Sequence, residues 1–271
     1  MSTMKLPRRP LAALGLTGLA AAALAGSAKP AEAQSVDDML NKKKVSIGIL
    51  IDLPPFGVVN AKNEYEGYDV DVAKLLAKYL GVTLDLVPVT GPNRIPYLLT
   101  NKVDVLVATF GITPERARQV QFSIPYSSID ILLVAPRQRK IANAAELKPL
   151  RVGVARASTQ DTAITGAAPQ GTRIMRFDDD ATTAQALLSG QIDAIGVNNI
   201  TLKQLQAMNP SAQYEPKFAL RHQPNGITLR RGATDLHQWV NTFIYFITNN
   251  GELNAVHQKW FGGPLPQLPV F

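Results

Sequence analysis

The sequence predicts an α/β fold built from two successive series of strands and helices. Short apolar runs typical of buried strands, such as 45–51 (VSIGILI), alternate with amphipathic helical segments, such as 69–80. A polar stretch at 137–144 interrupts this alternation, and a second series begins with a strand at 151–154. Two α/β units therefore follow one another along the chain.

The elements of the first series follow from residue spacing and from end signals. In segment 69–80 the apolar residues Val72, Leu76 and Leu80 share one face. Gly81 then suits the left-handed position that often ends a helix. The expected elements are strands 45–51, 83–89, 103–109 and 131–134, helices 69–80 and 95–101, and a helix that begins at Thr113-Pro114.

The second series shows the same signals. Gln223-Pro224-Asn225-Gly226 predicts a turn, because these residue types favour turn conformations. The Pro-rich tail at 264–271 is expected to be extended. The other expected elements are strands 151–154, 192–197 and 227–229, a helix from Thr159, and helices 182–189, 201–208, 236–247 and 253–260.

Arg116 is the first candidate for ligand binding. Thr113 is a good N-cap and Pro114 suits the first helical position, so Arg116 falls in the first turn of a helix. A cation beside the unpaired N–H groups and the positive end of the helix dipole requires an anion. Gly111, just before this helix, lets the backbone approach a ligand closely. We therefore expect a carboxylate-binding site here.

A second helix start of the same kind lies in the second series. Ala157, Ser158 and Thr159 are small and leave backbone N–H groups accessible, and Ser158 has capping-box spacing to Asp161. An anion held between the two helix starts would join the two α/β units.

The first residues of the chain predict export. Basic residues within 5–9 precede an apolar run at 11–26, and Ala31-Glu32-Ala33 is a typical cleavage signal. A signal peptide over residues 1–33 is therefore expected to be cleaved near Ala33, which places the mature protein in the periplasm. No later run reaches the length of a membrane span.

The composition excludes several classes of protein. The chain has no cysteine, which excludes disulfides, thiolate metal sites and a lipid-modified N-terminal cysteine. Its apolar content of 46% suffices for a large core. Part of the formal charge of +7 belongs to the leader, and no basic run is interleaved with aromatic residues, so nucleic acid is not an expected partner.

A set of short motifs indicates a family. They are PPF at 54–56, EGYDVDVA at 66–73, NKVDV at 101–105, ITPER at 112–116, FSIPY at 122–126, VGV at 152–154, GQIDA at 190–194 and KWFG at 259–262. In this order and spacing, the chain resembles the bacterial extracellular solute-binding proteins of the polar amino-acid type (family 3), which serve ABC importers.

The resemblance implies a two-lobed periplasmic binding protein, or flytrap, in which two strands cross between the lobes as a hinge. Lobe 1 is expected to contain residues 42–128 and 224–271, and lobe 2 residues 130–221. The resemblance also implies the ligand-binding residues. They are Arg116, the backbone around Thr109 and Gly111, the helix start at Ser158 and Thr159, and Phe56 as an aromatic lip.

One position departs from the family pattern. The acid that usually pairs with the ammonium group of the ligand is, by its spacing from Asp193, Asn198 in this chain. An asparagine can accept a hydrogen bond from an ammonium group but supplies no charge. Asp52 can compensate if the first loop shifts. The ligand is therefore expected to be an amino acid held differently, or a carboxylate without an α-amino group.

Other conspicuous residues favour structural roles. Three successive aspartates at 178–180 precede a helix and are typical of a solvated first turn, so no metal is expected. Asp69 and Asp71 likewise suit a helix start. The histidines lack metal-ligand spacing, and the aromatic residues near 240 are expected in the core. The histidines, His222, His237 and His257, are expected to pack at the surface or the hinge, and the aromatic residues are Trp239, Phe243, Tyr245 and Phe246.

Together these observations predict a non-enzymatic substrate-binding protein that delivers a small carboxylate, in the first place an amino acid, to a membrane ABC permease. A monomer without cofactor or metal is expected. The alternative is a periplasmic enzyme on the same scaffold, similar to cyclohexadienyl dehydratase. Such an enzyme needs a general acid or base in the cleft, which Asn198 does not supply but Asp52 or Glu115 can.

Overall fold

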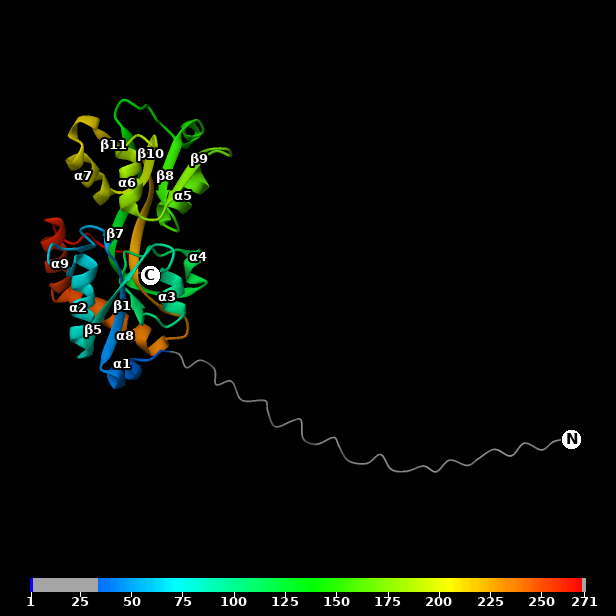
Figure 1. The fold of residues 1–271 in the computed structure, drawn as a ribbon. Helices are drawn as coiled ribbons and strands as arrows, with labels where there is room; N and C mark the ends of the chain where they lie inside the picture. The colour runs from blue at the N-terminus through cyan, green and yellow to red at the C-terminus, as the bar shows by residue number, and fades with distance from the viewer. Residues whose placement is uncertain (2–33, 270–271) are drawn as a thin grey trace. The chain divides into compact units, whose positions relative to one another are not determined.

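The fold is given by a computed structural model that describes residues 34–269 together with Met1 (Figure 1). The predicted signal peptide therefore lies, apart from Met1, outside the described residues. The strands are β1 (Lys44–Leu50), β2 (Asp52–Leu53), β3 (Gly57–Val59), β4 (Tyr65–Glu66), β5 (Thr83–Val89), β6 (Val105–Leu106), β7 (Val120–Pro136), β8 (Arg151–Ala155), β9 (Arg173–Phe177), β10 (Ala194–Asn198) and β11 (Tyr214–Arg230). The α-helices are α1 (Val36–Lys42), α2 (Tyr68–Leu80), α3 (Arg94–Leu99), α4 (Pro114–Ala117), α5 (Thr159–Ala167), α6 (Asp180–Leu188), α7 (Asn199–Met208), α8 (Thr234–Asn249) and α9 (Glu252–Phe261), with 3-10 turns at Ala144–Leu147 and Pro210–Ala212.

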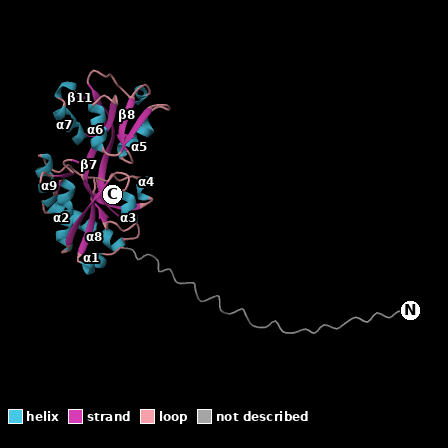
Figure 2. Ribbon diagram, viewed as in Figure 1, coloured by secondary structure: helices cyan, strands magenta, loops and turns pink. Residues whose placement is uncertain are grey.

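One long sheet runs through the molecule, with helices on both sides of its strands (Figure 2). Its strand order is β5-β1-β6-β11-β7-β10-β8-β9. At one end β1 pairs in parallel with β5 and β6, and at the other end β8 pairs in parallel with β9 and β10. Between them β7 and β11 form a long antiparallel pair. The short strands β2, β3 and β4 form a separate sheet.

The apolar side chains gather in separate cores, and these define the two lobes. We call lobe 1 the part built around the larger core, to which β1, α2 and α8 contribute Ile47, Leu76 and Val240. Lobe 2 is the part built around two smaller clusters on opposite faces of its parallel strands. Val152 of β8 packs in one cluster and Ile195 of β10 in the other. Because both faces are covered by helices, these strands read as continuous apolar runs.

The molecule is thus a two-lobed α/β protein, and β7 and β11 are the two strands that cross between the lobes. The boundaries 42–128 with 224–271 for lobe 1, and 130–221 for lobe 2, stay a proposal. Within residues 34–269, no helix combines the length and the apolar character that crossing a membrane requires.

The turn predicted at Gln223–Gly226 is wrong, because these residues lie inside β11. Pro224 and Asn225 pair with Ser128 and Ser127 of β7, and the register shifts between Asn225 and Gly226. The side-chain amide of Asn225 donates to Ser127 Oγ at 3.0 Å. Pro, Asn and Gly therefore mark an irregularity in a crossing strand, a place where such residues also occur.

Other differences concern lengths and exposure. The strand expected at 131–134 is the end of the much longer β7, and the strand expected at 103–109 shortens to β6. Two aromatic side chains of α8 that were expected in the core are exposed, Tyr245 at 66% and Phe246 at 50%. Phe243 of the same helix is buried. Helix α1, strand β9 and the small sheet were not predicted.

Candidate functional site

A polar pocket lies where the two sets of parallel strands point toward each other. In lobe 1 the chain leaves the carboxyl ends of β1, β5 and β6 toward this pocket, and in lobe 2 it does so from β8, β9 and β10. Ligands of α/β proteins commonly bind beyond the carboxyl ends of parallel strands. The lining residues are Leu50, Asp52, Leu53, Gly91, Arg94, Thr109, Arg116, Ile129, Ala155, Arg156, Ser158, Thr159, Gln160, Asp178, Asp179, Asp180, Asn198 and Gln223.

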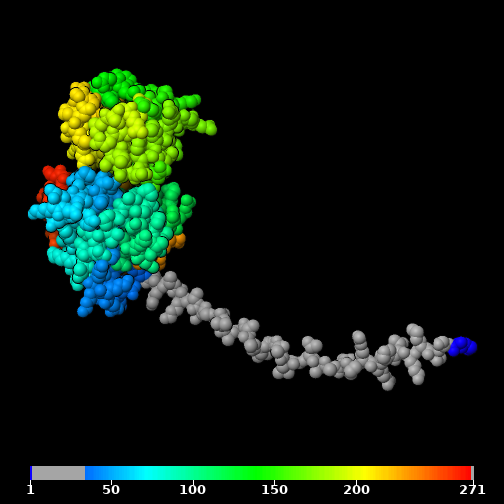
Figure 3. Space-filling view, viewed as in Figure 1, coloured from blue at the N-terminus to red at the C-terminus, as the bar shows by residue number. Residues whose placement is uncertain are grey.

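The lobes lie close together around this pocket, whose cavity has a volume of about 30 Å³. In the space-filling view the green-to-yellow surface of lobe 2 meets the blue-to-cyan surface of lobe 1 (Figure 3). Gln204 of α7 donates to the backbone oxygen of Pro54 at 2.6 Å, and this hydrogen bond also links the lobes. The structure is therefore that of a nearly closed cleft.

Arg116 lies in the pocket, as expected, and Thr113 caps the helix before it with Pro114 in the first turn. However, α4 is only four residues long, so its dipole is small. Backbone oxygens hold the guanidinium instead. It donates to Gly111 O at 2.8 Å and to Ala157 O at 3.0 Å, which leaves further N–H donors for a ligand.

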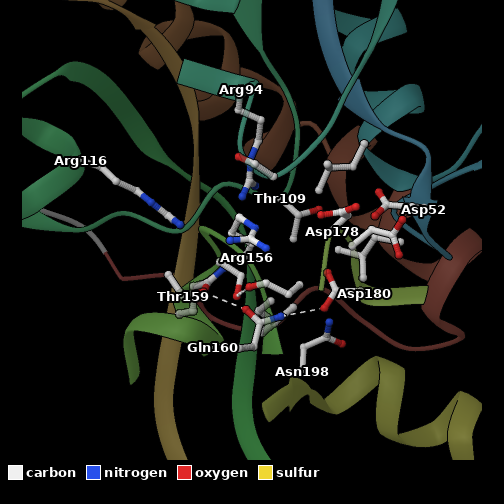
Figure 4. A pocket seen from close by; sticks show the side chains of 18 residues that line it. Asp52, Arg94, Thr109, Arg116, Arg156, Thr159, Gln160, Asp178, Asp180 and Asn198 are labelled. Atoms are coloured by element: carbon white, nitrogen blue, oxygen red, sulfur yellow. Dashed lines mark hydrogen bonds between the residues drawn. The ribbon is translucent and has the colours of Figure 1, made fainter. Parts of the chain in front are cut away.

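Arg94 is a second guanidinium in the pocket, and the sequence analysis missed it. It is buried and donates to Ala108 O at 3.1 Å. The guanidinium carbons of Arg94 and Arg116 lie 4.3 and 4.2 Å from the centre of the Phe110 ring. Figure 4 shows both side chains directed at the same region of the pocket.

Burial is the main cause of the lowered pKa values of these two arginines. Burial, and then repulsion from Arg94 and Arg221, lowers the pKa of Arg116 well below its usual value. Burial also lowers the pKa of Arg94, to about 10, although Asp180 and Asp52 oppose the shift. Among the described residues neither arginine forms a salt bridge. A buried cation in this state favours an anionic ligand.

Thr109 joins the pocket to a buried carboxylate beneath it. Its hydroxyl donates to Asp69 at 2.6 Å, and the hydroxyl of Tyr126 donates to the same carboxylate at 2.8 Å. Burial raises the pKa of Asp69 to about 6, and these two hydrogen bonds oppose the shift. Asp69 therefore does more than suit a helix start, because it holds Thr109, whose φ of 44° is rare for a β-branched residue.

Ser158 and Thr159 lie in the pocket at the start of α5, as expected. Only half of the predicted capping box is present. Ser158 Oγ accepts from Asp161 N at 3.0 Å, whereas the Asp161 carboxylate binds Arg176. The backbone N–H groups of Thr159 and Gln160 have no partner among the described residues, so they can donate to an anion.

The three aspartates at 178–180 stand at the start of α6, as expected, but they also line the pocket, and Asp179 and Asp180 are only partly exposed. Asp178 is exposed, and Asp179 caps α6 by accepting from Thr182 N at 2.7 Å. Asp180 accepts from Gln160 at 3.0 Å. Burial, followed by repulsion from Asp52, raises the pKa of Asp180 to about 7.

Asp52 and Asn198 both line the pocket, as expected, but the sequence did not predict that Asn198 also caps helix α7. Burial, followed by repulsion from Asp179, raises the pKa of Asp52. Asn198 is fully buried, and its Oδ1 accepts from the N–H groups of Ile200 and Thr201 at 2.9 Å each. Its oxygen is therefore committed to capping α7, and the pocket is left with the amide N–H donors.

Two predicted site residues do not line the pocket. Phe56 is 1% exposed and packs in the core of lobe 1 against Tyr68 and Phe261, so it forms no aromatic lip. Gly111 lies behind Arg116, where a Cβ atom would come within 2.5 Å of the Gln223 side chain. Leu53 stands in the pocket near the place where Phe56 was expected.

The pocket residues that the sequence analysis missed lie just beyond the carboxyl ends of strands. Arg94 comes five residues after β5, and Arg156 directly follows β8. The three aspartates directly follow β9, which was not predicted because arginines flank its apolar residues. Polar residues at the positions that follow a strand could therefore have indicated these members of the site. Within the described part of the chain, no group of three or more His, Cys, Asp or Glu side chains is placed to hold a metal ion.

Known proteins with similar sequences are amino-acid-binding proteins. The chain is 32% identical over 232 residues to the L-cystine-binding protein TcyJ of Escherichia coli strain K12, which covers 83% of this chain and 87% of that protein. It is 31% identical over 251 residues to the ABC transporter glutamine-binding protein GlnH of Bacillus subtilis strain 168, with 89% and 91% covered.

A solved structure with the same fold is that of the ancestral amino-acid-binding protein AncCDT-1, a precursor of cyclohexadienyl dehydratase. Its TM-score to this chain is 0.75 at 29% identity, with 83% of this chain and 99% of that chain covered. Residues 45–263 match the family described as bacterial extracellular solute-binding proteins, family 3. This match covers most of the chain, so the protein belongs to the bacterial extracellular solute-binding proteins of family 3.

Proposed function

We propose that this protein is the substrate-binding protein of an ABC importer and that it captures an amino acid between its two lobes. One observation carries the proposal. The pocket combines three guanidinium groups, Arg94, Arg116 and the exposed Arg156, with a group of carboxylates, Asp52, Asp178 and Asp180 (Figure 4). Such a pocket is complementary to a zwitterion, whose carboxylate and ammonium groups would each meet the opposite charge.

The carboxylate of the ligand binds on the arginine side. Arg116 supplies the free N–H donors of a planar fork, which suits two carboxylate oxygens. The open backbone N–H groups of Thr159 and Gln160 face the same region from lobe 2. Ser158 shapes this helix start but does not itself bind, because its hydroxyl accepts from Asp161 and donates to Ala155 O at 2.6 Å. Thr109 does not donate to this carboxylate, since its hydroxyl proton goes to Asp69, and its oxygen is left as an acceptor for an N–H group of the ligand.

Relatives named for cystine and for glutamine support an amino acid as the ligand of this chain too. The permease partner follows from the relative that is named as part of an ABC transporter. We further propose a monomer in the periplasm, with the signal peptide cleaved after Ala33. Gln34, the next residue, is 5% exposed and donates to Asp104 at 2.8 Å, so it packs well as a new N-terminus.

The second candidate is an enzyme similar to cyclohexadienyl dehydratase. The ancestral precursor described above and a carboxyl group with a pKa of about 7, Asp180, favour it. The close relatives are nevertheless named as binding proteins. We therefore place it second.

Native mass spectrometry and calorimetry test the two candidates together. Protein purified from its host is expected to carry one amino acid per chain, and after unfolding and refolding it is expected to bind that compound again. The compound should remain chemically unchanged after long incubation. Turnover above the rate in buffer would overturn the binding function in favour of the enzyme.

A further inference from the structure

Two carboxylates from different lobes approach each other across the pocket. Asp52 lies in β2 of lobe 1, and Asp180 is the first residue of α6 in lobe 2. Helix α6 and strand β2 are in contact. The two carboxylates are close enough that Asp52 contributes to the raised pKa of Asp180. Closure of the lobes therefore brings two like charges together.

This acidic pair has no directly bonded cation within residues 34–269. The Oδ1 atom of Asp52 is buried and accepts no hydrogen bond. Asp180 accepts from the neutral amide of Gln160. Arg94 faces the pair, and its charge opposes the rise in the pKa of both carboxyl groups. Among the described residues it forms no salt bridge with either, and its Nε and Nη1 groups donate to Gly91 O and Ala108 O. A buried acceptor without a donor is costly, so Asp52 Oδ1 favours a donor from the ligand, and a cationic donor would also offset the repulsion between the two carboxylates.

Asn198 independently indicates a ligand at this place. Its side chain is 0% exposed and lines the pocket, and its Nδ2 atom has no hydrogen-bond partner among the described residues. Because Oδ1 is bound to two backbone N–H groups, the amide can only donate to the pocket. Asn198 therefore cannot accept a hydrogen bond from an ammonium group. Its Nδ2 atom can instead donate a hydrogen bond to an acceptor atom of the ligand.

We propose that Asp52 and Asp180 jointly bind the ammonium group of the ligand and that closure of the lobes depends on this cation. The proposal rests on the proposed function, and it names the residues that accept hydrogen bonds from the ammonium group, which Asn198 cannot do. An ammonium group has three donors, which suit oxygens from both carboxylates at once. In the open protein water separates and hydrates the two groups, whereas closure without a cation leaves them desolvated and repelling. The ligand class is thereby restricted to carboxylates that carry an amine.

Calorimetry on single variants tests the assignment. The probes are the twenty standard L-amino acids and L-cystine, followed by the 2-hydroxy acid that matches the tightest of them. The wild type is expected to prefer the amino acid by more than a hundredfold. Asp52→Asn and Asp180→Asn are each expected to lower the affinity for the amino acid by ten- to a hundredfold. Each should lower the affinity for the hydroxy acid by less than threefold. Asp37→Asn, an exposed acid on α1, is the matched control and should change neither.

Two failures are distinguishable in this experiment. If no probe binds the wild type, the proposed function falls and this inference falls with it. If the amino acid binds but both variants keep the wild-type preference within threefold, only the acidic pair has been misassigned. Because the two substitutions lie in different lobes, a folding defect in one variant leaves the other to decide.

A distance measurement tests the link to closure. The chain has no native cysteine, so Lys62→Cys in lobe 1 and Lys148→Cys in lobe 2 can carry a pair of spin labels. The ligand-free protein is expected to be mainly open and to close with the amino acid but not with the hydroxy acid. In the Asp52→Asn, Asp180→Asn double variant, the closed population should rise at least threefold without any ligand. An unchanged ligand-free distance distribution in that variant would overturn the coupling.

Discussion

The guanidinium of Arg116 in lobe 1 donates a hydrogen bond to the backbone oxygen of Ala157 in lobe 2 at 3.0 Å. Ala157 has a left-handed backbone with φ of 58°, a conformation that most residues avoid. The hydrogen bond exists only when the lobes are close together. Arg116 is therefore placed to sense closure as well as to bind a carboxylate.

The first prediction concerns Arg116 itself. Arg116→Ala should weaken ligand binding by about 2–5 kcal/mol, because it leaves a buried carboxylate unpaired and removes a contact between the lobes. Arg116→Lys keeps the charge but loses the planar fork, and we expect an intermediate loss. Calorimetry with the natural ligand measures both, and circular dichroism checks that the fold is kept. Binding of the alanine variant within threefold of the wild type would contradict the assignment.

The second prediction concerns Gly111, which supports Arg116 from behind. An alanine Cβ would lie 2.5 Å from Gln223 Cδ, and the Gln223 side chain is held by hydrogen bonds to Thr159 and Asn225. Because this neighbour cannot move freely, Gly111→Ala should destabilise the protein by about 1–3 kcal/mol. Denaturant unfolding measures the change.

A second glycine-to-alanine substitution, which is expected to stabilise the protein, serves as the control. Gly166 lies within helix α5 and a Cβ there would meet nothing within 4 Å. Gly166→Ala should therefore stabilise the protein by roughly 0.5–1 kcal/mol through helix propensity. Equal effects at both glycines would show that the contact with Gln223 is not the cause.

The third prediction concerns an ion cluster in lobe 2 that fixes the end of β8. The Asp193 carboxylate accepts from Arg151 Nε at 2.9 Å and from Arg139 at 2.9 Å, and it also accepts from the backbone N–H of Arg151. These contacts, with the hydrogen bond from Arg151 as the largest cause, lower the pKa of Asp193 to about 2. Asp193→Asn should cost about 1–3 kcal/mol of unfolding free energy at pH 7.

The pH dependence separates this cluster from a packing effect. A lowered folded pKa stabilises the protein above the ordinary value of 3.8 and loses its effect as the pH falls toward 2. The difference between the wild type and Asp193→Asn should therefore shrink below about pH 4. A difference that stays constant down to pH 2.5 would assign the effect to shape and not to charge.

Local signals predicted most of the helices and strands because they depend on neighbouring residues. Strand 83–89 and helix 201–208, for example, differ from β5 and α7 by no more than two residues at either end. Of the crossing strand β11 only 227–229 was predicted, because its pairing with β7 joins residues about a hundred positions apart. That pairing overrides the turn preference of Pro224-Asn225-Gly226. Family membership and the two-lobed fold were also predictable, since they rest on ordered motifs.

The binding site was less predictable, because its residues meet only through the fold. Arg116, Thr109 and Asp52 lie in the pocket as expected, and a helix start or a strand end marks each of them. Phe56 was misplaced, since its burial against Tyr68 and Phe261 depends on helix α9. The Asn198 amide is oriented by its role as the N-cap of α7. The residue type alone does not reveal this role. The local sequence around Asp180 likewise resembles a solvated helix start, and only the approach of Asp52 gives it a different role.

The last prediction is that the ligand-free protein becomes less stable as the pH rises from about 4 to about 7. Asp69 is buried among lobe 1 residues whether the cleft is open or closed, and burial raises its folded pKa from the ordinary 3.8 to about 6. Asp180 adds a folded pKa of about 7 only in molecules whose lobes are closed. Between the ordinary and the folded values the folded protein binds more protons than the unfolded chain, so the free energy of unfolding falls as the pH rises.

Differential scanning calorimetry from pH 4.5 to pH 8 should show this decline in the melting temperature, and Asp69→Asn should make the curve flatter. Asp37→Asn, on the surface of α1, should leave the curve unchanged. An amino-acid ligand is expected to reverse the trend, because its ammonium group stabilises the ionised form of Asp180 and binds more tightly as the pH rises to 7. A melting temperature that rises across this range without ligand would mean that Asp180 and Asp69 are already ionised, and that another cation in the folded protein compensates them.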